Sequence, residues 1–195
     1  MKTDIILAGV GGQGILSIAT ILGAAALKED LFIKQAEVHG MSQRGGDVQS
    51  NLRISSSPIA SDLIPLGKAD LIISLEPMEA LRYLPWLAAD GWIVTNTIPF
   101  VNIPNYPDME VIKAEFANHK NVVAFDCDAL AKEVASPRTA NMVLLGAASP
   151  FIEIESEKIE DGIRAVFGAK GEEIVEMNIK AYRAGRKLAE ESAKA

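Results

Sequence analysis

The amino-acid sequence predicts an α/β fold of Rossmann-like type, in which a doubly wound, mostly parallel sheet is the middle of three layers, α/β/α. An apolar strand at residues 4–8 leads through a glycine-rich turn into a helix at about 13–28. The order strand, helix, strand then recurs along the chain, which favours parallel pairing with right-handed crossovers. An alternating run at 47–54, a turn at 55–58 and a short run at 59–61 predict a hairpin at one edge of the sheet.

The other strands are predicted from their apolar content and from the residues that end them. A run at 31–38 follows the first helix and is expected to be the second strand. A short, continuous apolar run is typical of a strand buried on both faces, and such runs occur at 69–75, 92–96 and 122–125. We therefore expect these three segments in the core of the sheet.

A helix is predicted between two of these strands, at 77–89. Pro77 suits the first helical turn, and the apolar residues of this stretch recur at helical spacing. Pro85 is expected to perturb its later part, and Asp90 with Gly91 to end it.

Further helices are predicted at 111–119, at 126–134 with a cap at Asp126 to Asp128, at 139–148, and at 156–167 with Ser156 as the cap. Glycines at 168 and 171 precede a last helix. Its residues near one face are Ile174, Met177, Tyr182, Gly185 and Leu188. Such a face requires another element to cover it.

Residues 97–108 are expected to be an irregular excursion, because prolines recur and no periodicity is visible. The segment is unusually apolar for a purely solvated loop. Its apolar residues, which could pack on the parent domain or on a partner subunit, are Phe100, Val101, Ile103 and Tyr106.

Length and composition limit the possible functions. With 195 residues and 49% hydrophobic content, residues 1–195 suffice for a single domain in which 138–195 form a helical C-terminal part. A net charge of -7 without a basic stripe argues against nucleic-acid binding. The sequence start lacks signal-peptide features and the apolar first unit is expected to be core rather than a membrane span, so we predict a cytoplasmic protein. One cysteine, Cys127, allows no internal disulfide and by itself no iron–sulfur cluster or zinc site.

The glycine-rich turn is the first candidate binding site. Gly9, Gly11 and Gly14 satisfy G-x-G-x-x-G between a strand and a helix, and Gly12 and Gln13 lie between them. Amides of the first helical turn favour an anion such as a phosphate. Alternatively, the glycines serve only the tight packing of strand against helix.

The loop after the second strand is the second candidate. Glu37, His39, Ser42, Gln43 and Arg44 lie within eight positions, at the expected ligand-binding edge of the sheet. Glu37 is also the one candidate for the acidic residue of a dinucleotide site. A solvated surface loop is the alternative interpretation. No residue forms a convincing acid–base constellation, so we predict no catalytic residue and no metal ligand in this chain.

Two motifs carry a resemblance to a known family: Gly-Val-Gly-Gly-Gln-Gly-Ile-Leu at 9–16 and Glu-Val-His-Gly-Met-Ser-Gln-Arg-Gly-Gly at 37–46. The chain resembles the gamma domain of thiamine-diphosphate-dependent 2-oxoacid:ferredoxin oxidoreductases, and most closely the small beta subunit of the indolepyruvate branch. The first motif is shared across that superfamily, whereas the second is similar to the arylpyruvate branch. Asp70, Glu76-Pro77 and Glu79-Ala80-Leu81 also fit the family pattern.

The resemblance implies an enzyme subunit that is inactive alone. In the family, aryl 2-oxoacids are oxidatively decarboxylated, coenzyme A takes the acyl group as co-substrate, and electrons pass to ferredoxin. Thiamine diphosphate, Mg and iron–sulfur clusters would belong to a large alpha subunit. Two alternatives remain: a gamma subunit for another 2-oxoacid, and a free-standing nucleotide-binding oxidoreductase that uses Gly9 to Gly14 and Glu37.

Overall fold

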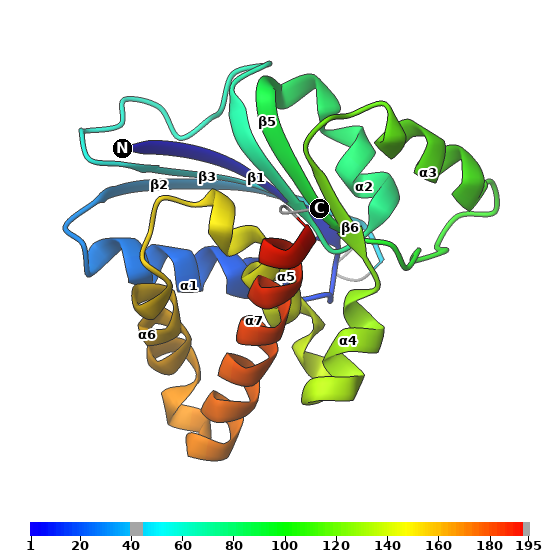
Figure 1. Ribbon diagram of the computed structural model, residues 1–195. Helices are drawn as coiled ribbons and strands as arrows, with labels where there is room; N and C mark the ends of the chain where they lie inside the picture. Colours follow the sequence, from blue (N-terminus) through cyan, green and yellow to red (C-terminus); the bar gives the residue numbers. More distant parts are fainter. Residues whose placement is uncertain (40–44, 193–195) are drawn as a thin grey trace.

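The computed structural model describes residues 1–39 and 45–192. Over those residues one sheet contains six strands in the order β2-β3-β1-β4-β5-β6, and helices cover both of its faces (Figure 1). The strands are β1 (Lys2–Val10), β2 (Phe32–His39), β3 (Asp47–Ser55), β4 (Ala69–Ser74), β5 (Leu87–Asn96) and β6 (Val122–Phe125). The α-helices are α1 (Ile15–Leu27), α2 (Pro77–Arg82), α3 (Met109–Ala117), α4 (Cys127–Val134), α5 (Ala140–Ala148), α6 (Ser156–Phe167) and α7 (Glu172–Ser192).

The strand pairing is mostly parallel, as predicted. β1 pairs with β4, β4 with β5 and β5 with β6 in parallel, while β3 lies antiparallel between β1 and β2. β1 and β2 therefore point in the same direction although they are not neighbours. The turn after β1 and the connection after β2 consequently lie at the same edge, which we call the carboxyl edge of the sheet.

The edge hairpin exists, but its predicted partner was wrong. β3 pairs with β2 from Phe32 opposite Ser55 to His39 opposite Val48, and residues 59–61 form no strand. The physical reason is that β3 offers two edges, and β1 and β2 occupy both. Residues 56–68 are instead a connection held by side chains, in which Pro58 and Pro65 lack the backbone donor that a sheet ladder needs.

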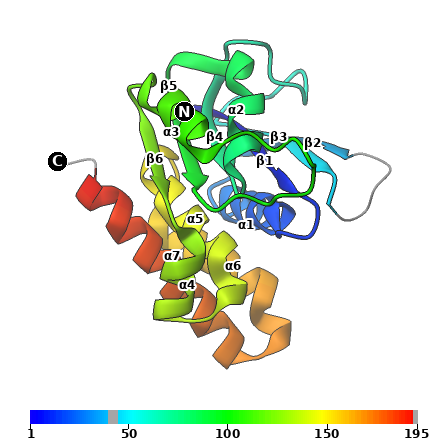
Figure 2. The same ribbon diagram turned by 90° about the vertical axis from the view of Figure 1, so that its right-hand side faces the viewer.

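The core has one part on each face of the sheet. Ile5 and Leu7 of β1 point towards α1, α5, α6 and α7, whereas Ile6 and Ala8 point towards α2 and α3. All four side chains are fully buried. Figure 2 shows the two groups of helices on opposite sides of the strands. This confirms the prediction of a first strand that is apolar because both of its faces are covered.

The helix predicted at 77–89 was wrong beyond Arg82. α2 ends there, a 3-10 turn follows, and β5 already begins at Leu87 and continues through Asp90 and Gly91. Pro85 explains the early end, because proline has no amide hydrogen and its ring clashes with the preceding helical turn. Gly91 is buried in the strand, where a Cβ atom would lie 2.9 Å from the carbonyl oxygen of Ala69. A side chain at this position would therefore disturb the pairing of β5 with β4.

The last helix is covered by α5 through a contact between small residues. A Cβ atom on Gly185 would lie 1.9 Å from the carbonyl oxygen of Val143, and one on Gly146 would meet Tyr182 at the same distance. The predicted face was only partly right. Tyr182 and Gly185 are buried, but Ile174, Met177 and Leu188 are only half-buried, and the rest of the buried face consists of Val175, Asn178, Ile179, Ala181 and Ala189.

Ser156 does not cap α6, contrary to prediction. The N-cap position is Glu155, and Ser156 occupies the first helical turn. Its hydroxyl instead forms a 2.9 Å hydrogen bond with the hydroxyl of Tyr182, so this serine links α6 to α7.

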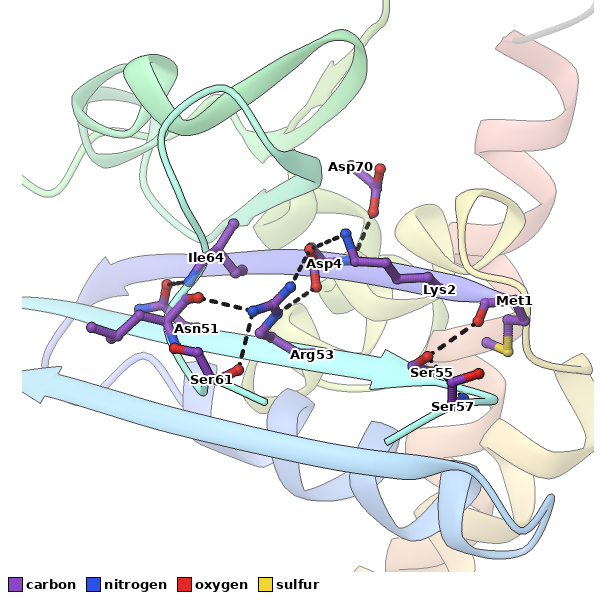
Figure 3. A network of polar contacts seen from close by, with 11 residues as sticks. Met1, Lys2, Asp4, Asn51, Arg53, Ser55, Ser57, Ser61, Ile64 and Asp70 are labelled. Carbon is purple, nitrogen blue, oxygen red and sulfur yellow. Dashed lines mark hydrogen bonds and ion pairs between the residues drawn. The ribbon is translucent and has the colours of Figure 1, made fainter. Parts of the chain in front are cut away.

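A polar network at the beginning of β1 fixes the 56–68 connection (Figure 3). The carboxylate of Asp4, whose side chain is 1% exposed, accepts hydrogen bonds from Arg53 at 2.8 and 3.0 Å and pairs with Lys2 at 2.8 Å. The guanidinium of Arg53 also donates to the carbonyl oxygens of Ser61 and Leu63, each at 3.0 Å. One buried charge pair therefore joins two strands and the connection that follows them.

Candidate functional site

A cleft opens at the carboxyl edge, where β1 and β4 lie side by side and their following helices cover opposite faces. Ligands of open α/β sheets bind at such a point, outside the carboxyl ends of the strands. The cleft has a volume of about 320 Å³, and its walls come from the glycine turn, the ends of β4 and β5, the first turn of α4 and the start of α5. Its lining residues are Gly12, Gln13, Leu75, Asn96, Asp128, Pro137, Arg138, Ala140 and Asn141.

The glycine turn forms one wall, and two of its glycines adopt a left-handed backbone. Gly12 has φ of 103° and Gly14 has φ of 84°, values that other residues adopt only with strain. A Cβ on Gly14 would also lie 2.8 Å from the amide nitrogen of Asn141. Gly9 lies in β1, where a Cβ would be 3.0 Å from the side-chain oxygen of Gln13. The turn thus requires glycine for structural reasons, and its role in binding stays a prediction.

Gln13 uses its side-chain amide within the fold. Its oxygen accepts a 2.7 Å hydrogen bond from the amide of Val10, and its nitrogen donates to the carbonyl oxygen of Leu75 at 3.2 Å. The side chain therefore connects the ends of β1 and β4. If Gln13 contacts a ligand, as predicted, it does so from a position that these two bonds fix.

The opposite wall consists of residues that sequence reasoning did not identify as site residues. Asn96 ends β5 and is buried, and its side chain donates to the Asp128 carboxylate at 2.8 Å. The Asn96 oxygen accepts from the amides of Cys127 at 3.0 Å and Ile98 at 3.3 Å. A polar residue at the carboxyl end of a buried strand was the available signal for Asn96.

Two further residues complete this wall from the C-terminal part of the chain. Arg138 brings a positive charge to the cleft, and Asn141 donates a 3.2 Å hydrogen bond to the carbonyl oxygen of Gly14. The Asn141 side chain is half-buried. The cleft therefore presents a cation, an anion, three side-chain amides and a glycine turn to a polar ligand.

The second candidate loop ends beside the glycine turn. The amide of Gly11 donates to the carbonyl oxygen of Gly46 at 2.8 Å. His39 ends β2, whereas Ser42, Gln43 and Arg44 lie outside the described residues. The base of the loop is thus at the carboxyl edge, and the roles predicted for its side chains stay predictions.

The position of Glu37 weakens the dinucleotide alternative. Glu37 is exposed on β2, and β3 separates β2 from β1. Because adjacent strands are about 4.8 Å apart, β2 lies roughly 10 Å from the strand that carries the glycine turn. In a Rossmann dinucleotide site the acidic residue ends the strand next to the glycine-rich unit. The inserted strand moves Glu37 away from that place.

A buried carboxylate fixes the irregular segment 97–108 to the domain. Glu76 is fully buried and caps α2 by accepting from the amide of Glu79 at 2.8 Å. It also accepts from the amide of Phe100 at 3.2 Å and from the hydroxyl of Tyr106. Burial, and then the hydrogen bond to Glu76, raise the pKa of Tyr106 well above its ordinary value. The segment is irregular, as predicted, and one part of it packs on its own domain.

The residues of this chain do not fit an iron–sulfur cluster. Such clusters are held by several thiolates, and the sequence has one cysteine, Cys127, which is fully buried. Burial raises the pKa of its thiol well above the ordinary value. In residues 1–39 and 45–192, no group of three or more His, Cys, Asp or Glu side chains could hold a metal ion.

Comparison with known proteins decides the family. The family model of pyruvate ferredoxin/flavodoxin oxidoreductases matches residues 4–188. The chain belongs to this family. The indolepyruvate oxidoreductase subunit IorB of Pyrococcus horikoshii is 39% identical over 96% of this chain and 96% of its own length. The 2-oxoglutarate synthase subunit KorC of Methanothermobacter marburgensis is 29% identical over the full length of both chains. These relatives confirm the resemblance drawn from the two motifs.

Solved structures of the family confirm the fold. The gamma subunit of a keto/oxoacid ferredoxin oxidoreductase from Geobacter sulfurreducens superposes with a TM-score of 0.70, at 25% identity, over 97% of this chain and 99% of that one. The 2-oxoglutarate:ferredoxin oxidoreductase from Magnetococcus marinus gives a TM-score of 0.78 at 24% identity. This chain is covered completely in that match but spans only 32% of the longer protein. Among the described helices, none is both long and apolar enough to cross a membrane.

Proposed function

We propose that the chain is the small (beta) subunit of an indolepyruvate or arylpyruvate:ferredoxin oxidoreductase. The complex would convert aryl 2-oxoacids to acyl-CoA by thiamine-diphosphate-dependent oxidative decarboxylation and pass the electrons to ferredoxin. The observation that carries the proposal is 39% identity to an indolepyruvate oxidoreductase subunit over nearly the whole of both chains. The lower identity of 29% to a 2-oxoglutarate synthase subunit makes another 2-oxoacid the second candidate.

The partner in this proposal is a large alpha subunit that carries thiamine diphosphate, Mg and the iron–sulfur clusters. The single buried cysteine of this chain supports that division, because a cluster needs ligands that this chain does not have. Residues 1–195 would act as one gamma-type domain in the cytoplasm. The chain's own contribution would be to complete the assembly and to shape the approach to the active site.

The cleft at the carboxyl edge would bind a phosphate-bearing part of coenzyme A. In this proposal Gly9, Gly11, Gly12, Gln13 and Gly14 form the cradle, because the turn opens onto a helix N-terminus. Arg138 on the facing wall would supply the positive charge that a phosphate requires. The alternative, a free-standing dinucleotide enzyme, is disfavoured by the separation of Glu37 from β1.

Glu37, His39, Ser42, Gln43 and Arg44 would face the large subunit near its active-site entrance. Replacing Arg44 by alanine is expected to weaken subunit affinity by about 2 to 5 kcal/mol, because a guanidinium can hold a carboxylate through two parallel bonds at a desolvated interface. Lysine should not restore the contact, because it lacks that planar geometry. Wild-type affinity and turnover in both Arg44→Ala and Arg44→Lys would contradict this role.

Reconstitution tests the proposal as a whole. The chain would be produced with and without the large subunit of the same organism and purified under anoxic conditions. Iron, thiamine diphosphate and turnover of indolepyruvate, phenylpyruvate and 2-oxoglutarate with coenzyme A and ferredoxin are then measured. We expect aryl 2-oxoacid turnover by the complex and none by the isolated chain. Preference for 2-oxoglutarate would favour the second candidate. A complex that fails to form, together with strong stabilisation of the isolated chain by NAD, NADP or FAD, would favour a free-standing enzyme.

A further inference from the structure

The segment 97–108 exposes four large apolar side chains within six positions. The exposed fractions are 41% for Ile98, 43% for Phe100, 67% for Val101 and 37% for Ile103. We call these four residues the apolar patch. Single exposed apolar residues are common on any protein, but a contiguous set of large ones marks an interaction site. The domain core, which takes up Tyr106 of the same segment, leaves these four in solvent.

Hydrogen bonds fix the backbone that carries the patch. The side-chain oxygen of Asn96 accepts a hydrogen bond from the backbone amide of Ile98 at 3.3 Å. The buried carboxylate of Glu76 accepts one from the backbone amide of Phe100 at 3.2 Å. The Asn102 side chain donates to the carbonyl oxygen of Gly45 at 2.6 Å, so the segment reaches the base of the β2–β3 loop (Figure 2). A surface that is already ordered binds a partner without the entropy cost of ordering a loop. These bonds thus hold the patch in place before any contact is made.

The patch borders the cleft, and two exposed aspartates lie beside the segment that carries it. Asn96 lines the cleft and also holds the start of the segment through Ile98. Asp47 begins β3 next to the loop base that Asn102 contacts, and Asp108 ends the segment as the N-cap of α3. Both aspartates are exposed, and the whole chain carries a net charge of -7. Because a two-fold contact places the same surface on both sides, a second copy of this chain would bring these acidic groups together.

We propose that Ile98, Phe100, Val101 and Ile103 form the docking surface for the large subunit, and that the matching surface of that subunit is apolar at its centre with lysine or arginine at its rim. The proposal rests on the proposed function, which supplies the partner. It adds which residues of this chain contact the large subunit, and what kind of side chains the large subunit presents to them. Docking here would place the partner beside the cleft, because Asn96 both lines the cleft and binds the amide of Ile98.

Replacement of the two most exposed patch residues tests the apolar centre. The double variant Phe100→Ser/Val101→Ser and the single variant Val101→Ser are combined with the purified large subunit, and affinity is measured by calorimetry. We expect the double variant to bind at least about tenfold more weakly, which corresponds to a loss of 1.4 kcal/mol. The matched control is Leu63→Ser/Leu66→Ser, since these side chains are 56% and 64% exposed on the 56–68 connection. The control should bind within twofold of wild type.

The outcomes separate this inference from the proposed function. If the wild-type chain does not bind the large subunit, the proposed function fails. If the wild-type chain binds, and if Phe100→Ser/Val101→Ser and Val101→Ser bind as tightly as wild type, the docking surface is elsewhere and this inference fails. Melting temperatures of all variants are measured alongside. If the double variant is destabilised, the affinity of the single variant Val101→Ser is used for the test instead. Val101 is 67% exposed and contributes little to the core, so its replacement should not unfold the chain.

Neutralising the acidic rim tests the charge of the partner. Asp108→Asn removes a charge but retains the helix cap, because asparagine caps as well as aspartate. Combined with Asp47→Asn, it should slow association severalfold at low salt and flatten the dependence on ionic strength. Asp62→Asn, at an exposed position of the 56–68 connection, is the control. An unchanged salt dependence would overturn the basic rim. A dimer of the isolated chain that Val101→Ser dissociates would show that a second copy covers the patch instead.

Discussion

The beginning and the end of β1 use polar residues in opposite ways. At the beginning, the buried carboxylate of Asp4 is surrounded by Arg53 and Lys2, and the amide of Asp4 donates to Asp70 at 2.7 Å. At the end, the glycine turn opens onto a cleft to which Arg138 brings a charge. The polar groups at the beginning of β1 bind one another within the fold, whereas those at its end line a cleft that has room for a ligand. Stability and function should therefore respond to substitutions at different ends of the same strand.

The largest effect is expected from Arg53→Ala. Removing the guanidinium leaves the Asp4 carboxylate buried with only Lys2 as counterion, and breaking a buried pair costs about 3 to 5 kcal/mol. Urea denaturation measures the change in the free energy of unfolding. The control is Arg164→Ala, whose ion pair with Glu176 is exposed and should matter by less than about 1 kcal/mol. Similar losses in both variants would remove the distinction between a buried network and surface pairs.

A smaller effect is expected at the other end of β1, in the glycine turn. Gly14→Ala places a Cβ at positive φ and within 2.8 Å of the Asn141 amide nitrogen, and should cost about 1 to 3 kcal/mol. Gly12 also has positive φ, but its surroundings are open, so Gly12→Ala should cost only the backbone strain, about 1 kcal/mol. Thermal denaturation of the two variants separates crowding from strain. Equal costs would mean that Asn141 moves aside freely.

The smallest effect is a pH dependence that originates at Tyr83. Burial, followed by the charges of Asp47 and Glu79, raises the pKa of Tyr83 to about 12. The folded state therefore holds this proton more tightly than the unfolded chain, whose tyrosine titrates near 10. Its contribution to stability is present below pH 10 and is lost as the pH rises from about 10 to about 12.

Comparing Tyr83→Phe with wild type isolates this contribution. Between pH 9 and pH 11 the wild type should lose about 1 kcal/mol more than the variant, since phenylalanine has no proton to release. The free energy of unfolding is measured across this range in urea. Parallel curves for the two proteins would show that the phenol of Tyr83 titrates alike in the folded and unfolded states.

The first strand, its turn and its helix could be predicted from sequence because local signals agree there. Apolar residues, glycines and a helix-forming run follow one another, and the structure repeats that order from β1 to α1. A unit can be predicted from sequence when its local propensities agree with its place in the whole fold. In the stretch after α2 the local signals and the fold disagree. The spacing of Leu81, Leu84 and Leu87 suits a helix, yet Pro85 ends it and pairing with β4 recruits Leu87 into a strand.

The cleft was only half predictable. The glycine turn is continuous in sequence, so its residues could be named together. The facing wall collects Asn96, Asp128, Arg138 and Asn141 from separate elements, and only the folded chain brings them to one place. The hairpin partner was missed for a related reason. Strand pairing depends on which edge is free in three dimensions, and no local pattern at 59–61 reports that.

The insertion of β3 between β1 and β2 has a consequence for the order of folding. β2 and β3 are joined by a short connection, so their hairpin can close within microseconds. β1, by contrast, pairs with partners far along the chain: Lys2 lies opposite Ser55, and Ile5 lies beside Leu71. Each of these ladders must first overcome the entropy of closing a long loop. β1 thus has to wait for segments later in the chain before its ladders can form, and until then its apolar side chains need protection from other chains.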